Sequence, residues 1–163
     1  MSFHSKLTEK VVSVGEIEKF VNVLRIYGKK IVFTNGCFDI LHLGHVDYLN
    51  QARDSGDALI IGLNTDSSVK RQNKGENRPV NNEESRAKLL AALSCVDAVV
   101  LFEDETPYEL IKLIQPDVLV KGDDYKAEDI VGYDIVKKRG GEVITIPLVK
   151  GYSTTSLINK IKS

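Results

Sequence analysis

Two histidines lie three residues apart in the segment Thr34 to His45, which has the sequence T-N-G-C-F-D-I-L-H-L-G-H. With Gly44 between them, the chain can turn tightly, and both imidazoles can face the start of a predicted helix, where free N–H groups and the helix dipole attract phosphate. The alternative is that His42 and His45 only cap the helix and pack in the core. The preceding strand and the glycine pattern favour phosphate binding. The segment supplies four further candidate nucleotide-binding residues: Asn35, Gly36, Phe38 and Asp39.

A second segment, Gly151 to Ser156, is rich in hydroxyl groups and opens the last predicted helix. One Ser or Thr at a helix start is an ordinary cap worth about 1 kcal/mol, so a purely structural role stays open. Several hydroxyls beside exposed N–H groups would form a second anion cradle. The candidate binding residues here are Tyr152, Ser153, Thr154 and Thr155.

A third segment, Val120 to Tyr125, follows a predicted strand and contains a Gly-Asp pair typical of a turn. At the carboxyl end of a strand it could instead contact the base or ribose of a nucleotide, or organise a metal-bound phosphate. Its candidate residues are Lys121, Gly122, Asp123 and Asp124.

Smaller features could contribute to the same site or be ordinary surface groups. Asn64 and Asp66 end a strand, and Arg86 lies early in a helix. The polar stretch from Lys70 to Asn82, which holds Lys70, Arg71, Lys74, Glu76 and Arg78, has no periodicity and is interpreted as a mobile loop. Cys37 is interpreted as a small packed residue rather than a nucleophile, because no base at a recognised spacing serves it.

The elements that must position these residues alternate along the chain. Five runs rich in β-branched residues predict strands: Lys30 to Thr34, Ala58 to Asn64, Ala98 to Phe102, Val118 to Lys121 and Glu142 to Ile146. Between and after them, helical spacing is found in five segments: Gly44 to Ser55, Glu83 to Leu93, Pro107 to Ile114, Ala127 to Arg139 and Ser153 to Ile161. This pattern predicts an α/β fold, a Rossmann-like doubly wound parallel five-stranded sheet with helices on both faces.

The N-terminal residues fit a helical extension to a catalytic core. Val14 to Tyr27 predicts a helix packed outside the core, with Gly28 as its stop signal. We therefore expect a single domain over residues 1–163, divided into an extension at 1–28 and a core at 29–163.

Composition limits the partners. A formal net charge of -1 gives no general attraction to nucleic acid or acidic membranes, so small anions are the expected partners. No signal peptide or long apolar stretch is seen, and Cys37 and Cys95 are in no metal-ligand spacing. We expect a cytoplasmic protein with free thiols and no structural zinc.

The H-x-G-H after the first strand and the S-T-T before the last helix resemble the cytidylyltransferase-like nucleotidyltransferases. Within that superfamily the sequence is most similar to the heptose 1-phosphate adenylyltransferase branch, over about Lys30 to Lys162. Glycerol-3-phosphate cytidylyltransferases carry R-T-x-G before S-T-T, whereas Leu148 to Gly151 reads L-V-K-G. The resemblance rests on these segments: Thr34 to His45, Asn64 to Asp66, Lys70-Arg71, Arg78 to Asn81, Arg86, Val120 to Tyr125 and Gly151 to Leu157.

The resemblance implies transfer of AMP from ATP to D-glycero-β-D-manno-heptose 1-phosphate, giving ADP-heptose and pyrophosphate for lipopolysaccharide core synthesis. His42 and His45 would stabilise the transition state, and Lys70 and Arg71 would neutralise the terminal phosphates. Mg²⁺ would bind with ATP, held mainly by phosphates, with Asp39 as a possible ligand. A homodimer and a separate heptose kinase as pathway partner are also implied.

The sequence also allows other interpretations of the function. The same fold could act as a CTP-dependent glycerol-3-phosphate or phosphoethanolamine cytidylyltransferase, or as an FMN adenylyltransferase. A nucleotide-binding regulator without turnover is a further class. The histidine pair, the basic stretch and the S-T-T segment argue against the regulator, because a sensor needs only base and ribose contacts.

Overall fold

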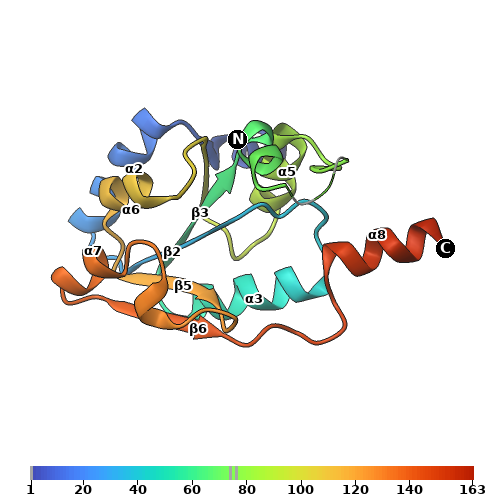
Figure 1. The fold of residues 1–163 in the computed structure, drawn as a ribbon. Coiled ribbons are helices and arrows are strands. Elements are labelled where there is room, and N and C mark those ends of the chain that lie inside the picture. The colour runs from blue at the N-terminus through green and yellow to red at the C-terminus, as the bar shows by residue number, and fades with distance from the viewer. Residues whose placement is uncertain (1, 74, 76) are drawn as a thin grey trace.

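A computed structural model describes residues 2–73, 75 and 77–163 of the chain (Figure 1). Lys74 and Glu76 of the predicted mobile loop lie outside the described residues. The strands are β1 Val11–Val12, β2 Ile31–Gly36, β3 Ala58–Asn64, β4 Ala98–Phe102, β5 Val118–Gly122 and β6 Glu142–Ile146. The helices are α1 Phe3–Glu9, α2 Val14–Ile26, α3 Leu43–Asp54, α4 Asp66–Arg71, α5 Glu83–Ala91, α6 Tyr108–Ile114, α7 Tyr133–Lys138 and α8 Thr154–Lys162, with a 3₁₀ turn at Ala127–Asp129.

The sheet is fully parallel, as predicted, but it has six strands rather than five, in the order β1-β4-β3-β2-β5-β6. The additional strand comes from the N-terminal extension, where Val11 and Val12 pair with Val99 and Val100 of β4. A two-residue strand carries too little periodicity to be found in a sequence. It pairs with part of the edge that β4 would otherwise expose.

Helices cover both faces of the sheet. One face packs against α3 and α5 and the other against α2, α6 and α7, because successive residues of each strand point to opposite sides. The prediction that helix α2 packs outside the core is wrong, because Ile17 and Val21 are fully buried against the sheet. The extension is therefore part of the same hydrophobic core as the remainder of the fold.

Glycines set two helix boundaries. Gly28 follows α2 with a φ of +63°, which confirms it as the stop signal. The predicted helix from Ala127 to Arg139 is interrupted, because Gly132 has a φ of +90° and a Cβ there would come within 2.7 Å of the Ile111 side chain. Only a short turn precedes that break, and α7 follows it.

The sheet changes winding direction between β2 and β5. From β2 the chain adds β3 and β4 on one side, and β5 and β6 then build on the other. At such a point two neighbouring strands send their following loops in opposite directions and leave a crevice beyond their carboxyl ends. In Figure 1 the helices α3 and α8 begin close together at this end of the sheet. Within the described part of the chain, no helix has the length and apolar character needed to cross a membrane.

Candidate active site

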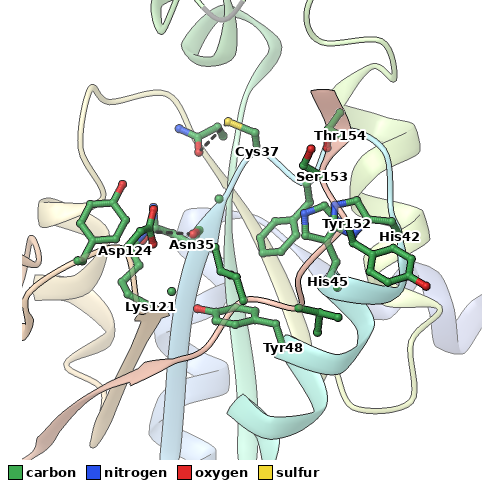
Figure 2. A pocket seen from close by; sticks show the side chains of 18 of the residues that line it. Asn35, Cys37, His42, His45, Tyr48, Lys121, Asp124, Tyr152, Ser153 and Thr154 are labelled. Carbon is green, nitrogen blue, oxygen red and sulfur yellow. Dashed lines mark hydrogen bonds between the residues drawn. The ribbon is translucent and has the colours of Figure 1, made fainter. Parts of the chain in front are cut away.

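A cavity of about 510 Å³ lies at the carboxyl ends of β2 and β5, in the crevice at the winding change (Figure 2). Most residues predicted from the three sequence segments line it, and so does Asn64 at the end of β3. They are Asn35, Gly36, Phe38, His42, Gly44, His45, Asn64, Lys121, Gly122, Asp124, Tyr152, Ser153 and Thr154. Segments from both ends of the sequence therefore meet at one place.

The two histidines stack on each other on one wall of the cavity. The ring centroids of His42 and His45 are 3.8 Å apart with an interplanar angle of 18°, and Phe38 packs against His45 edge to face. Tyr152, on the loop before α8, stacks over His42 at 6.3 Å. The Nδ1 atoms of both histidines are buried and lack hydrogen-bond partners among the described residues.

The close packing of this wall requires a glycine. A Cβ on Gly44 would lie 3.1 Å from the His42 ring and 3.2 Å from Cβ of Tyr152. Contacts this short are tighter than most that real side chains make, so either the ring or the loop would have to move. Gly44 thus lets the start of α3, His42 and the loop before α8 come together.

Burial keeps both imidazoles neutral near pH 7. It lowers the pKa of His45 from its ordinary 6.5 to about 4, with repulsion from His42 adding to the effect and the Ile40 carbonyl opposing it. Burial also lowers the pKa of His42. Two stacked imidazolium ions would repel each other strongly, so the stacking favours uncharged rings.

Two helices begin at the cavity. His42 is the N-cap of α3, but its side chain forms no capping hydrogen bond, so N–H groups of the first turn are left for another acceptor. Ser153 caps α8 through a capping box with Ser156, at 3.0 Å from the Ser156 amide. The Ser153 hydroxyl is thus occupied locally, and Thr154 is the first helical residue that lines the cavity.

The opposite wall is built by the ends of β2 and β5. The Lys121 ammonium donates to the carbonyl oxygen of Asn35 at 3.2 Å and lies 5.7 Å from the ring centre of Tyr125. Figure 2 shows Lys121, Asn35 and Asp124 across the cavity from the histidines. This wall presents one ammonium group and one carboxylate.

Asp39 does not face the cavity, contrary to the prediction that it orients substrate or metal. Its buried carboxylate accepts hydrogen bonds from Arg78 Nε at 2.5 Å, from the amide of Val80 at 2.8 Å and from the amide of Asn81 at 2.9 Å. These donors occupy the carboxylate, so it anchors the segment before α5. Among the described residues, no group of three or more His, Cys, Asp or Glu side chains could hold a metal ion.

Arg86 and Asp66, both predicted to bind the nucleotide, bind each other instead. Arg86 is completely buried, and its guanidinium lies 2.7 Å from the Asp66 carboxylate. It also donates to the carbonyl oxygens of Cys37 at 2.7 Å and Asn81 at 3.0 Å. Arg86 therefore holds the loop after β2 against the segment before α5, and neither charged group lines the cavity.

Four other predicted residues also lie outside the cavity lining. Lys70 and Arg71 belong to α4 rather than to an irregular loop, and Arg71 pairs with Glu103 on the surface. Lys70 lines a separate hollow of about 270 Å³ with Arg78. Asp123 accepts a weak hydrogen bond from the Leu148 amide at 3.4 Å, and Thr155 lies beyond the lining.

Sequence reasoning did not assign a binding role to six lining residues: Cys37, Tyr48, Gln72, Tyr125, Leu148 and Val149. Tyr48 shares a 2.8 Å hydrogen bond with Thr34, and burial raises its pKa to about 12. Cys37 is half-buried rather than packed away, with its sulfur 3.3 Å from Gln72 Oε1. The position of Cys37 inside the first segment was a usable signal, but the others become neighbours only through folding.

A parallel doubly wound sheet with a crevice at its switch point is the architecture of nucleotide-binding α/β domains. Residues 33–160 match the cytidylyltransferase-like family. The chain belongs to that family and is a nucleotidyltransferase.

Relatives with curated names support this placement. The chain is 60% identical over 147 residues to the bifunctional protein HldE of Aliarcobacter butzleri, covering 90% of this chain and 30% of that protein. It is 52% identical over 161 residues to the bifunctional protein HldE of Wolinella succinogenes, covering 99% of this chain and 33% of that protein. The chain thus spans about a third of the length of these relatives.

Solved structures agree with the fold. The lipopolysaccharide core biosynthesis protein of Thermoplasma volcanium is 30% identical with a TM-score of 0.62, covering 77% of this chain and 99% of that one. The pantoate-beta-alanine ligase of Francisella tularensis has the same TM-score at 17% identity, covering 93% of this chain and 76% of that one. The second likeness concerns the fold alone.

Proposed function

We propose that the chain transfers AMP from ATP to D-glycero-β-D-manno-heptose 1-phosphate and forms ADP-heptose and pyrophosphate. The observation that carries the proposal is the stacked pair of His42 and His45 between the starts of two helices at the switch point of the sheet. The heptose assignment is supported by the resemblance of Leu148 to Thr155 and of Arg78 to Asn81 to the heptose branch, and by the name of the Thermoplasma relative.

The chemistry needs little from the protein beyond position and charge. An oxygen of the sugar 1-phosphate attacks the α-phosphorus of ATP in line, the bond from that phosphorus to the bridging oxygen breaks, and pyrophosphate leaves. The nucleophile is already an anion at pH 7, so no general base is required. Charge that develops on the phosphorus oxygens is what the site must stabilise.

The histidine pair can stabilise this developing charge, because both rings are uncharged before the nucleotide binds and can then gain protons. The negative charges of a bound triphosphate would raise the pKa values of both imidazoles and favour rings that donate hydrogen bonds to phosphate oxygens. The first-turn N–H groups of α3 and α8 would add fixed donors that need no reorganisation. Tyr152, packed over His42, would keep the donor rings in place.

Cationic groups would neutralise the remaining negative charge of the triphosphate. Lys121 supplies one positive charge on the far wall, and Lys70 lines a separate hollow with Arg78 and would have to approach the terminal phosphates from there. Arg71 would have to leave Glu103 to take part. Mg²⁺ would be held mainly by the triphosphate, with Asp124 as the lining carboxylate in reach, and would neutralise phosphate charge.

Pyrophosphate release tests the proposal directly. ATP or CTP is combined with either D-glycero-β-D-manno-heptose 1-phosphate or glycerol 3-phosphate, and kcat/KM is measured for all four pairs. ATP with the heptose phosphate should exceed CTP with glycerol 3-phosphate by about a hundredfold, since two mispaired polar groups cost about 1 to 3 kcal/mol each. A preference for CTP with both acceptors would overturn the nucleotide assignment. ATP turnover only with an acceptor other than a sugar 1-phosphate would overturn the acceptor.

A further inference from the structure

A second cavity, of about 430 Å³, lies at the amino ends of the strands, opposite the end of the sheet that carries the histidines. It is formed where β2, β5 and β6 begin, because Lys30, Asp117 and Glu142 all line it. In Figure 1 this is the end of the sheet where the last residues of α2 and α7 approach the starts of the strands. Nothing in the proposed transfer reaction uses it.

Cationic groups outnumber anionic ones in this second cavity. Four cationic side chains line it: Arg25, Lys29, Lys30 and Arg139. Among the described residues two carboxylates, Asp117 and Glu142, also line it, and Lys29 pairs with Asp57 at 3.9 Å. Asp117 accepts the backbone amide of Ile31 at 2.8 Å, and Glu142 lies 3.8 Å from the Lys30 ammonium.

Two guanidinium groups are held close together there. Arg25 donates to the carbonyl oxygens of Ile114 at 2.5 Å and Gln115 at 3.2 Å, and Arg139 donates to the side-chain oxygen of Gln115 at 2.5 Å. Gln115 thus ties both arginines to the end of α6. Each guanidinium has five N–H donors, so donors remain on both after these bonds.

Holding two like charges side by side costs free energy that a counter-anion would recover. Burial and, after it, the Arg139 charge lower the pKa of Arg25, whereas the Asp117 charge raises it. The neighbouring chain segments pack closely against each other, since a Cβ on Gly141 would lie 2.6 Å from the Asp117 carbonyl oxygen.

We propose that this second cavity is a binding site for a phosphate-type oxyanion, held by Arg25 and Arg139 with help from Lys29 and Lys30. A multiply charged oxyanion matches the planar guanidinium donors, which bind phosphate in pairs. The site is separate from the histidine cavity, so both can be filled together. The proposal does not depend on which nucleotide or acceptor the chain uses.

Amide-resolved NMR titration with inorganic phosphate tests it, with sodium chloride exchanged to hold ionic strength constant. The amides of Lys30, Gly140 and Gly141 should shift along one saturable curve, distinct from that of Gly44 at the histidine cavity. Shifts at the second cavity that stay linear, or that chloride alone reproduces, would overturn the proposal.

Variants sharpen this test. Arg139→Gln, at an exposed position, should weaken the fitted phosphate affinity at the second cavity about tenfold, the usual effect of losing one charge-assisted hydrogen bond. Lys138→Gln removes the same charge one residue away from the lining and should change it less than about twofold. Equal effects of the two variants would contradict the site, whatever the overall folding of either.

The source of the phosphate group is distinguished separately. Phosphatidylglycerol vesicles should retain the wild-type protein, and Arg139→Gln should abolish retention, if a lipid headgroup fills the site. Retention no greater than on phosphatidylcholine vesicles, beside a saturable shift with inorganic phosphate, identifies a soluble phosphate compound.

Discussion

The fully buried guanidinium of Arg86 forms a 2.7 Å ion pair with the carboxylate of Asp66 and, through its other nitrogens, holds the carbonyl oxygens of Cys37 and Asn81. Cys37 belongs to the loop that leads from β2 to the histidines. The geometry of this loop thus depends on a residue that lines no part of the cavity.

Replacing Arg86 by Met should destabilise the fold by about 3 to 5 kcal/mol, because the Asp66 carboxylate and two carbonyl oxygens lose their partner. Urea denaturation measures the change. Arg71→Met, which removes an exposed pair with Glu103, is the matched control and should cost less than about 1 kcal/mol. Similar losses for both variants would show that the buried network contributes nothing special.

Gly44→Ala should lower kcat/KM by roughly tenfold or more with little loss of folding, because the new Cβ displaces the His42 ring or the loop at Tyr152. Gly15→Ala, in α2, meets nothing within 4 Å and is the control. It should leave activity unchanged and stabilise the fold by about 0.5 to 1 kcal/mol. Full activity of Gly44→Ala would mean that the tight packing of this wall is not needed.

His45→Ala should fold normally and lose roughly 10² to 10³ in kcat, the usual effect of removing one transition-state donor. Steady-state pyrophosphate release measures it once the substrate pair is established. Asn50→Ala, on the exposed side of α3, should stay close to wild type. Activity of His45→Ala within about threefold of wild type would exclude the catalytic role.

The free energy of unfolding should fall as the pH drops from 6.5 towards 4. Over that window the unfolded chain protonates His45 while the folded protein, in which burial lowers its pKa to about 4, does not. The unfolded state therefore gains stability, by about 1 to 3 kcal/mol after allowance for partial exposure of the ring. Above pH 6.5 the group has no effect. Denaturation curves of wild type and His45→Asn should diverge in this window, and parallel curves would contradict the burial argument.

The alternation of strands and helices, and therefore the parallel doubly wound class, could be predicted from the residues alone. β-branched runs and helical periodicity are local properties, and parallel strands need crossovers, so the architecture follows. The same logic located the cavity, since the segments from Thr34, Val120 and Gly151 all follow strands at their carboxyl ends. The spacing of His42 and His45, with Gly44 between them, likewise predicted that both rings lie at the start of a helix.

Which charged residues face the cavity could not be predicted before the chain was seen folded. Asp39, Asp66 and Arg86 lie in the right segments, yet they form ion pairs and hydrogen bonds with protein groups distant in sequence. The short strand β1 and the burial of α2 were likewise invisible, because each depends on a partner surface supplied by other parts of the chain. The type of a residue determines which interactions it can form, but the segments that fold against it determine which partners it meets. A buried charged side chain orients towards those partners, because leaving it unpaired would cost free energy.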